Sequence, residues 1–284
     1  MRLLERTLDA LGVVNRLATF DGKHGWCSEA VCAEGIEWME LLAMKRGRRG
    51  RDDAFVEGAL ARLSARVESL KRAEDAYERY VLLKVIATTF DGLRDVARFR
   101  DEAAALKESK EFRAALAAEE RQFADEGRHA QEIVGAGRGL LNPSTHDAAL
   151  ARLKNVIAPL DEQSKAEADG AARRVARRTL GTVYAETLEA ALFRYAPQKN
   201  YKFAAVNLEL AAAVLPALAE TEFELARVLA LDGRKEDALA ALERAVEKGF
   251  RDGERIEHED AFATLRGGKK YEQLRARIRS GSAK

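Results

Sequence analysis

Apolar residues recur every three or four positions through most of this 284-residue chain, and only 4 prolines interrupt the pattern. Beyond Asp52 the spacing places such residues on one face of successive helices, beginning with Val56, Leu60, Leu63 and Val67. Proline breaks helix interiors, whereas the abundant Ala, Leu, Glu and Arg favour them. The sequence therefore predicts an all-α fold, in which antiparallel helix pairs build an α–α superhelix.

One segment near the N-terminus has strand character instead. Val13 to Phe20 (VVNRLATF) starts with β-branched residues and is followed by a turn at Asp21-Gly22. We expect this segment to be extended. The chain offers it no second strand, and an unpaired strand exposes its backbone donors and acceptors. We therefore expect it to be poorly paired or to dock against another chain.

A helix is predicted from Ser28 to about Lys45. Ser28 is a suitable N-cap, because its hydroxyl oxygen can accept a hydrogen bond from an N–H group of the first turn. The apolar side chains expected to face the core are Val31, Ile36, Trp38, Met39, Leu42 and Ala43.

The sequence divides into three regions. Residues 1–50 hold the strand-like segment and the helix that follows it. Residues 51–142 form a first helical region, and residues 143–284 form a helical repeat region. The glycine-rich stretch GAGRGLLNP, at positions 135–143, is the strongest internal boundary.

Charge and hydropathy exclude several classes of partner. The 48 Lys and Arg residues nearly balance the 47 Asp and Glu residues, for a net charge of +1. Such a balance gives no overall field to attract nucleic acid or an anionic membrane. The sequence has no run of about 18 apolar residues, so no transmembrane helix is predicted. Charges at Arg2, Glu5 and Arg6 interrupt any signal-peptide core, which predicts a cytoplasmic protein if Met1 is the true start.

The most specific pattern lies between Glu222 and Phe250. Gly233 separates two helical stretches, and small residues stand where the two helices would cross closely, at Ala226, Ala238 and Ala245. Larger apolar residues fill the flanking positions, at Leu229 and Leu242. This segment resembles a tetratricopeptide repeat, which implies a helical hairpin. It departs from the repeat where Glu222 replaces an aromatic residue and Phe250 replaces a proline.

A weaker version of the repeat precedes this hairpin. Leu180, Gly181 and Tyr184 have the L-G-x-x-Y spacing on a long helix predicted from about Ala168 to Phe193, and a second helix follows from Tyr201 to Leu215. After Phe250 a short helix and a final amphipathic helix, at positions 271–278, are expected to cover the open end of the last repeat. The alternative is a plain helical bundle with a chance alanine pattern.

A histidine near the N-terminus suggests a second resemblance. The run FDGKHGW, at positions 20–26, places His24 after a strand-like segment and a turn, and before a helix. Residues 1–50 resemble the last strand, histidine loop and last helix of a bacterial esterase-type α/β-hydrolase with a helical extension. The resemblance implies that His24 is a catalytic general base. A catalytic triad also needs a nucleophile and an acid, and this sequence has no G-x-S-x-G motif.

Two interpretations of His24 therefore stay open. The chain is either a free-standing scaffold that keeps a hydrolase remnant, or the C-terminal part of a hydrolase that supplies His24 to a separate domain. No zinc site is predicted from His24, Cys27 and Cys32, because a structural zinc needs four ligands. The basic run KRGRRGR, at positions 45–51, is interpreted as a solvated helix end.

The remaining candidate residues do not form a predicted active site. Four arginines, at positions 173, 174, 177 and 178, form a basic stripe, and three histidines, at positions 129, 146 and 258, lie far apart in the sequence. We predict a protein–protein interaction scaffold without cofactor or metal, whose partner is a protein or peptide. The residues proposed to contact a peptide are Gln198, Lys199, Asn200 and Arg227.

Overall fold

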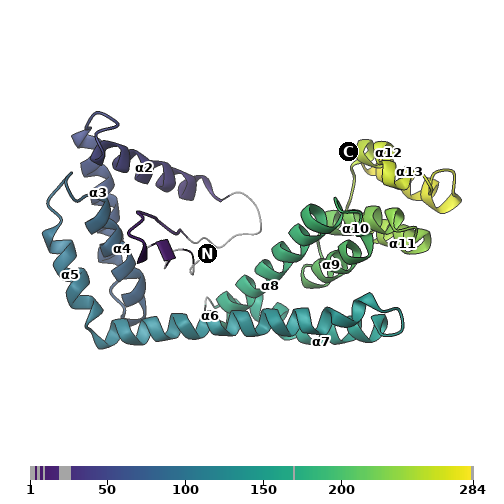
Figure 1. Ribbon diagram of the computed structural model, residues 1–284, viewed down its shortest axis with the longest axis horizontal. Helices are drawn as coiled ribbons and strands as arrows, with labels where there is room; N and C mark the ends of the chain where they lie inside the picture. The colour runs from purple at the N-terminus through teal and green to yellow at the C-terminus, as the bar shows by residue number, and fades with distance from the viewer. Residues whose placement is uncertain (1–3, 5–6, 9, 19–26, 169, 283–284) are drawn as a thin grey trace. The chain divides into compact units, whose positions relative to one another are not determined.

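The structure is a computed structural model that describes residues 4, 7–8, 10–18, 27–168 and 170–282. Within these residues the regular structure is helical and contains no strand (Figure 1). The prediction of an all-α fold is confirmed. The chain divides into two compact units, Met1–Arg121 and Gln122–Lys284. Helix α6 (Lys110–Gly137) contains the division between them.

Among the described residues, the N-terminal unit has four helices with defined bounds and the start of α6. These are α2 (Glu29–Lys45), α3 (Asp53–Ser69), α4 (Ala76–Thr89) and α5 (Ala97–Lys107), with a 3-10 turn η1 (Ala73–Asp75) before α4. Side-chain caps fix where two of them begin. The Ser28 hydroxyl accepts a hydrogen bond from the Val31 N–H at 3.4 Å, as the sequence predicted, and Asp52 Oδ1 accepts one from the Phe55 N–H at 3.0 Å.

Helices α2, α3, α4 and α5 share one hydrophobic core. Its fully buried members include Leu41, Val56, Leu83, Ile86 and Phe90. The predicted apolar face of α2 is therefore wrong in part. Leu41 and Met44 are the buried residues of this helix, whereas Ile36 and Met39 are exposed. Apolar residues three or four positions apart occur on more than one face of α2, so the spacing alone does not identify the buried face. Packing against α4 buries the face that carries Leu41.

The N-terminal segment predicted to be extended forms no sheet in the residues that can be described. Residues 13–18 have neither helical nor strand structure, and positions 19 and 20 lie outside the described residues. Arg16 of this segment donates to the Glu34 carboxylate at 2.6 Å and to the Glu34 carbonyl at 3.3 Å. These bonds connect the segment to helix α2.

The C-terminal unit continues with helices that pack against one another in chain order (Figure 1). After α6 a 3-10 turn η2 (Arg138–Leu141) leads into the unit's remaining helices, since the glycine-rich stretch ends α6 at Gly137. They are α7 (His146–Ser164), α8 (Ala171–Glu189), the π-helix η3 (Ala190–Tyr195), α9 (Tyr201–Val214), α10 (Ala219–Leu231) and α11 (Lys235–Glu247). The chain then forms α12 (Gly253–His258), the 3-10 turn η4 (Asp260–Phe262) and α13 (Lys269–Ser282).

Two hydrophobic cores hold this unit together. One joins the end of α6 to α7, α8 and α9 through residues such as Ile133, Leu153, Val183 and Leu210. The other joins α9, α10 and α11 to the last helices of the chain. The long helix predicted from about position 168 is α8, which begins at Ala171 and passes into the π-helix after Glu189.

Candidate functional site

The α10–α11 hairpin has the close helix crossing that its alanines predict. Ala226, Ala238 and Ala245 are completely buried, and Leu229 and Leu242 lie in the same core. Gly233 has φ +80°, a left-handed conformation that glycine adopts without steric cost, and it reverses the chain between the two helices. Small side chains at the crossing let the backbones approach, and the larger ones close the remaining gaps.

Glu222 lies in a buried ion-pair network. Its Oε1 lies 2.5 Å from Lys248 Nζ, and its Oε2 accepts a hydrogen bond from Arg244 Nε at 3.0 Å. Arg244 lies on α11, and Lys248 is the C-cap residue of that helix. A buried carboxylate is costly unless it is paired and hydrogen-bonded, and here it is both. Glu222 therefore joins α10 to the end of α11 by charge.

Phe250 makes an aromatic contact with α10. Its ring stacks on Phe223 with centroids 4.2 Å apart and an interplanar angle of 11°, and Phe262 meets Phe223 edge-on at 5.6 Å. Tyr271 packs on Phe262 and donates its hydroxyl proton to the Ile256 carbonyl at 3.0 Å. Through these contacts α12, η4 and α13 share the hydrophobic core of the hairpin.

Arg227, one of the residues predicted to contact a peptide, is held by the chain's own carboxylates. From Thr221 to Ala230 every residue of α10 except Arg227 is buried. Arg227 Nη2 lies 2.7 Å from Glu224 Oε2, and its Nε lies 4.0 Å from Glu259. Glu224 also pairs with Arg255, whose guanidinium lies over the Phe223 ring. Helix α10 thus presents little free surface.

The other three predicted contact residues lie together in an exposed turn. Gln198, Lys199 and Asn200 connect the π-helix η3 to α9, and all three are exposed. Lys199 has φ 57°, and the Asn200 N–H donates to the Tyr195 carbonyl at 3.0 Å, which fixes the turn. The structure brings these three residues together, whereas Arg227 belongs to the network on α10.

Exposed aromatic residues flank this turn. The side chain of Phe193, on η3, is 78% exposed, and that of Phe203, on α9, is 39% exposed. Tyr195 and Phe203 pack together across the turn with ring centroids 5.6 Å apart. Neither phenylalanine was predicted to be a surface residue from the sequence. A π-helix at the end of α8 changes which side chains face the core, and helical spacing in the sequence does not reveal it.

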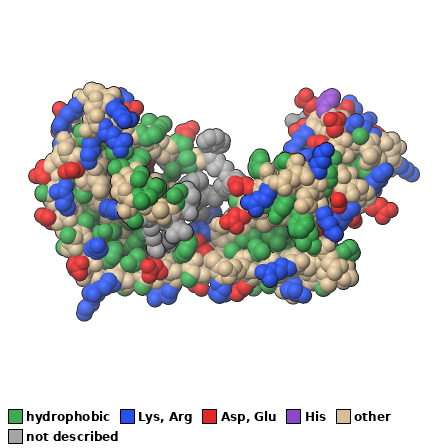
Figure 2. Space-filling view, in the orientation of Figure 1, with side chains coloured by type: hydrophobic (Ala, Val, Ile, Leu, Met, Phe, Trp, Pro, Cys, Tyr) green, Lys and Arg blue, Asp and Glu red, His purple; other side chains and the backbone are tan. Residues whose placement is uncertain are grey.

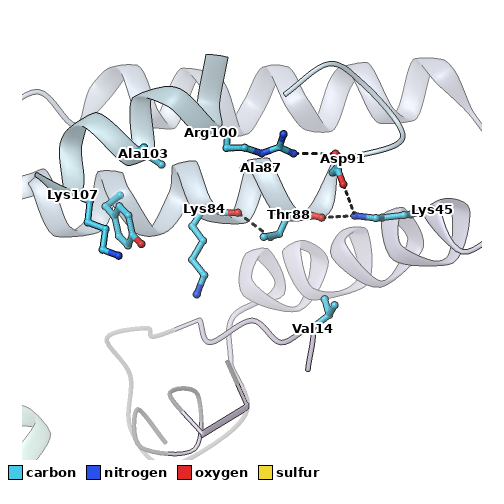
Figure 3. Close-up of a pocket in the computed structure, with 11 residues that line it drawn as sticks. Val14, Lys45, Lys84, Ala87, Thr88, Asp91, Arg100, Ala103 and Lys107 are labelled. Atoms are coloured by element: carbon cyan, nitrogen blue, oxygen red, sulfur yellow. Dashed lines mark hydrogen bonds and ion pairs between the residues drawn. The ribbon is translucent and has the colours of Figure 1, made fainter. Parts of the chain in front are cut away.

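The N-terminal unit contains a cavity of about 570 Å³ beside α4 and α5. Figure 3 shows the residues that line it, drawn from the end of α2, from α4, from α5 and from the N-terminal segment. They are Val14, Lys45, Tyr80, Lys84, Ala87, Thr88, Asp91, Arg100, Ala103, Ala104 and Lys107. No site was predicted here from the sequence, because these residues are scattered over more than ninety positions.

Hydrogen bonds and ion pairs order one end of this cavity. Lys45 Nζ donates to the Thr88 carbonyl at 2.7 Å and lies 3.9 Å from Asp91 (Figure 3). Arg100 Nη2 donates to Asp91 Oδ1 at 3.1 Å. Asp91 therefore holds a lysine from α2 and an arginine from α5 on the same side of the cavity.

The N-terminal residues that could carry chemistry are only partly described. His24 belongs to residues 19–26, which lie outside the described part of the chain. Cys27 Sγ and Cys32 Sγ are 3.1 Å apart, and the hydrogen bond between them raises the pKa of the Cys32 thiol. Among the described residues no group of three or more His, Cys, Asp or Glu side chains could hold a metal ion.

The basic runs noted in the sequence have intramolecular partners. Arg49 pairs with Glu40, and Arg51 donates to Asp53 at 2.9 Å and to the Leu93 carbonyl at 2.6 Å. In the stripe on α8, Arg178 Nε donates to Glu126 at 2.6 Å, and the other three arginines also have interaction partners. These contacts make both runs part of the helix packing.

His146 forms the one histidine contact in the described residues that joins two helices. Its Nε2 lies 2.9 Å from Glu209 of α9. Burial alone would lower the pKa of His146, but the hydrogen bond and the charge of Glu209 outweigh it and raise the pKa.

No protein-family model, no curated protein and no solved structure matches this chain. In the described residues no helix is both long and apolar enough to cross a lipid bilayer.

Proposed function

We propose that this protein is a protein-interaction scaffold, and that its C-terminal unit binds a protein or peptide at the turn between η3 and α9. The observation that supports this most strongly is the exposure of Phe193, at 78%, beside the packed pair of Tyr195 and Phe203. Aromatic side chains on a fixed surface are frequent anchors of protein interfaces.

The surroundings of the aromatic residues favour a particular kind of partner. Arg194, Lys199 and Lys202 are exposed on η3, on the turn and on α9. Interfaces commonly combine an apolar centre with a charged rim. A partner that presents an apolar side chain next to acidic residues would fit both features.

The packing behind the turn supports a rigid binding surface. Ala204, Ala205 and Leu208 of α9 are completely buried against the neighbouring helices. The surface side chains therefore project from a helix whose opposite face is fixed. A π-helix is rare, and such segments are frequent at functional positions in proteins.

The proposal can be tested by selecting peptides from a random phage-displayed library on the purified protein. Binding of the enriched peptides is then compared between the wild type and the Phe193→Ser/Phe203→Ser variant. We expect enriched peptides to combine acidic and apolar residues, and their affinity for the variant to fall by about tenfold or more, since interface aromatics each contribute on this scale.

A matched control replaces two exposed apolar residues of α2, as Ile36→Ser/Met39→Ser. This variant loses comparable apolar surface and should bind the same peptides as the wild type. Equal loss in both variants, equal retention in both, or the absence of any enriched peptide would each contradict the proposal.

A further inference from the structure

The two cysteines of the chain lie next to each other at the beginning of α2. The sequence contains 2 cysteines, and Cys27 Sγ lies 3.1 Å from Cys32 Sγ. Both are free thiols in the structure. A covalent bond between two sulfur atoms is about 2.05 Å long, so these atoms would need to approach each other by about 1 Å to form one. A movement of this size is within the reach of side-chain rotation.

The N-cap of α2 brings the two thiols together. Ser28 is the N-cap residue, and its hydroxyl accepts a hydrogen bond from the Val31 N–H. Cys27 directly precedes the cap. Cys32 is the fourth residue of the helix, and its N–H donates to the Ser28 carbonyl at 3.0 Å. Side chains at these two positions commonly meet across the start of a helix, so the proximity of the sulfur atoms follows from the capped backbone.

Helix α2 also holds one of the thiols in a fixed place. Glu34 of α2 lies 3.6 Å from Arg66 of α3, and Leu41 is buried in the core that both helices share. Cys32 therefore projects from a helix that is packed against its neighbours. A thiol that is already positioned loses less conformational entropy when it forms a disulfide.

Both thiols are accessible to a small molecule. Cys32 is exposed and Cys27 is half-buried. Free cysteine is among the most buried residue types in proteins, where it packs as a small apolar side chain. Contact between two accessible side chains removes little apolar surface from water and so contributes little stability. Reactivity of the thiols explains the pairing better than packing does.

We propose that Cys27 and Cys32 form a dithiol site that reduces low-molecular-weight disulfides and is itself converted to an intramolecular disulfide. The thiolate of one cysteine attacks the small disulfide, which forms a mixed disulfide and releases one small thiol. The thiolate of the second cysteine then attacks the protein sulfur of the mixed disulfide and releases the second small thiol. The two protons of the cysteines pass through water to the two released thiolates. The protein loses two electrons and the small disulfide gains them.

The proposal is tested by equilibrating the protein with hydroxyethyl disulfide and β-mercaptoethanol at a series of ratios. This pair is uncharged, so it is not biased by the acidic and basic side chains that are mixed over the visible face of the N-terminal unit (Figure 2). The remaining thiols are blocked with a maleimide, and the products are identified by mass spectrometry. We expect the wild type to lose both thiols together, with the mass of the chain lowered by two hydrogen atoms.

The matched control is Cys32→Ser/Ala33→Cys, which keeps two thiols but moves the second one to the next position of α2, also exposed. One residue rotates a side chain by about 100° around the helix axis, which turns the new thiol away from Cys27. Its intramolecular disulfide should be at least about tenfold less favourable than that of the wild type, because the sulfur atoms no longer meet. Equal oxidation of the two proteins would show that the 3.1 Å approach has no chemical role and would overturn the proposal.

A single variant tests the second step of the reaction. Cys27→Ser has no second thiol, so Cys32 should accumulate the mixed disulfide with β-mercaptoethanol, whereas the wild type should resolve it. Circular dichroism verifies that all variants keep their helical content. A wild type that carries two small-molecule adducts, forms disulfide-linked dimers or stays reduced at the most oxidising ratio would refute the dithiol site. The site lies in the N-terminal unit, so this result does not depend on peptide binding by the C-terminal unit.

Discussion

The C-terminal hairpin with its cap and the cavity of the N-terminal unit use the same charged residue types in opposite ways. On the hairpin and cap, four cations face four carboxylates: Arg227, Arg244, Lys248 and Arg255 with Glu220, Glu222, Glu224 and Glu259. The cavity has four cations and one carboxylate. On the hairpin and cap each of these carboxylates contacts at least one cation, whereas at the cavity Lys45 and Arg100 share Asp91.

The carboxylates of the two regions also differ in how deeply they are buried. The Glu222 side chain is 4% exposed and the Asp91 side chain is 57% exposed. A buried carboxylate that loses its partners is strongly destabilising, while an exposed one contributes little to stability. Removal of a carboxylate should therefore cost more stability at the hairpin than at the cavity.

The largest effect is expected from the aromatic contacts of the hairpin. Phe223→Ala removes a completely buried ring that contacts Phe250 and Phe262, and should lower the free energy of unfolding by about 3–5 kcal/mol. Phe193→Ala, at an exposed ring of the same unit, should change it by less than about 0.5 kcal/mol. Urea unfolding measures both changes in stability. Similar values for the two variants would contradict the assignment of Phe223 to the core and Phe193 to the surface.

The buried carboxylate should give the next largest effect. Glu222→Ala leaves Arg244 and Lys248 without their shared partner, and should destabilise the protein by about 2 kcal/mol. The value lies below that of a fully buried pair, because both cations can turn to water. Asp91→Ala provides the comparison in the cavity and should cost less than about 1 kcal/mol. If Asp91→Ala destabilised the protein more than Glu222→Ala, the expected difference between the buried and the exposed carboxylate would be refuted.

The smallest expected effect is a pH dependence at His146. Because Glu209 raises the pKa of His146 in the folded protein, the pair stabilises the fold below the unfolded-state pKa of about 6.5 and loses this contribution as pH rises through the higher folded-state pKa. The contribution should be below about 1 kcal/mol. Urea midpoints at acidic and alkaline pH should differ less in His146→Gln than in the wild type, whereas the exposed His258→Gln substitution should preserve the difference.

The sequence was most informative where a pattern is local. Helix formers and scarce proline predicted an all-α fold, and the spacing of Ala226, Ala238 and Ala245 predicted the hairpin that the structure contains. Both signals depend on residues within one or two helical turns or one hairpin. Such patterns are set by the 3.6-residue period and by the space between two adjacent helices.

Contacts between distant segments could not be predicted in the same way. Glu222 and Phe250 were seen only as departures from a repeat, since their partners Arg244, Lys248 and Phe223 become neighbours only when the helices pack. The cavity is a stronger example, because its four cations come from three helices. Side chains at Ile36 and Met39 were assigned to the core for a related reason: spacing identifies apolar rows but not the row that a neighbour covers.

The π-helix η3 has a consequence for the register of the helix that contains it. Each residue of an α-helix advances the side chain by about 100° around the axis, so one extra residue in a regular α-helix rotates every following side chain by that angle. A π-helical turn holds about one more residue than an α-helical turn and therefore takes up this rotation. The segment Ala190–Tyr195 thus carries Phe193 at the surface while Ala191 stays in the core.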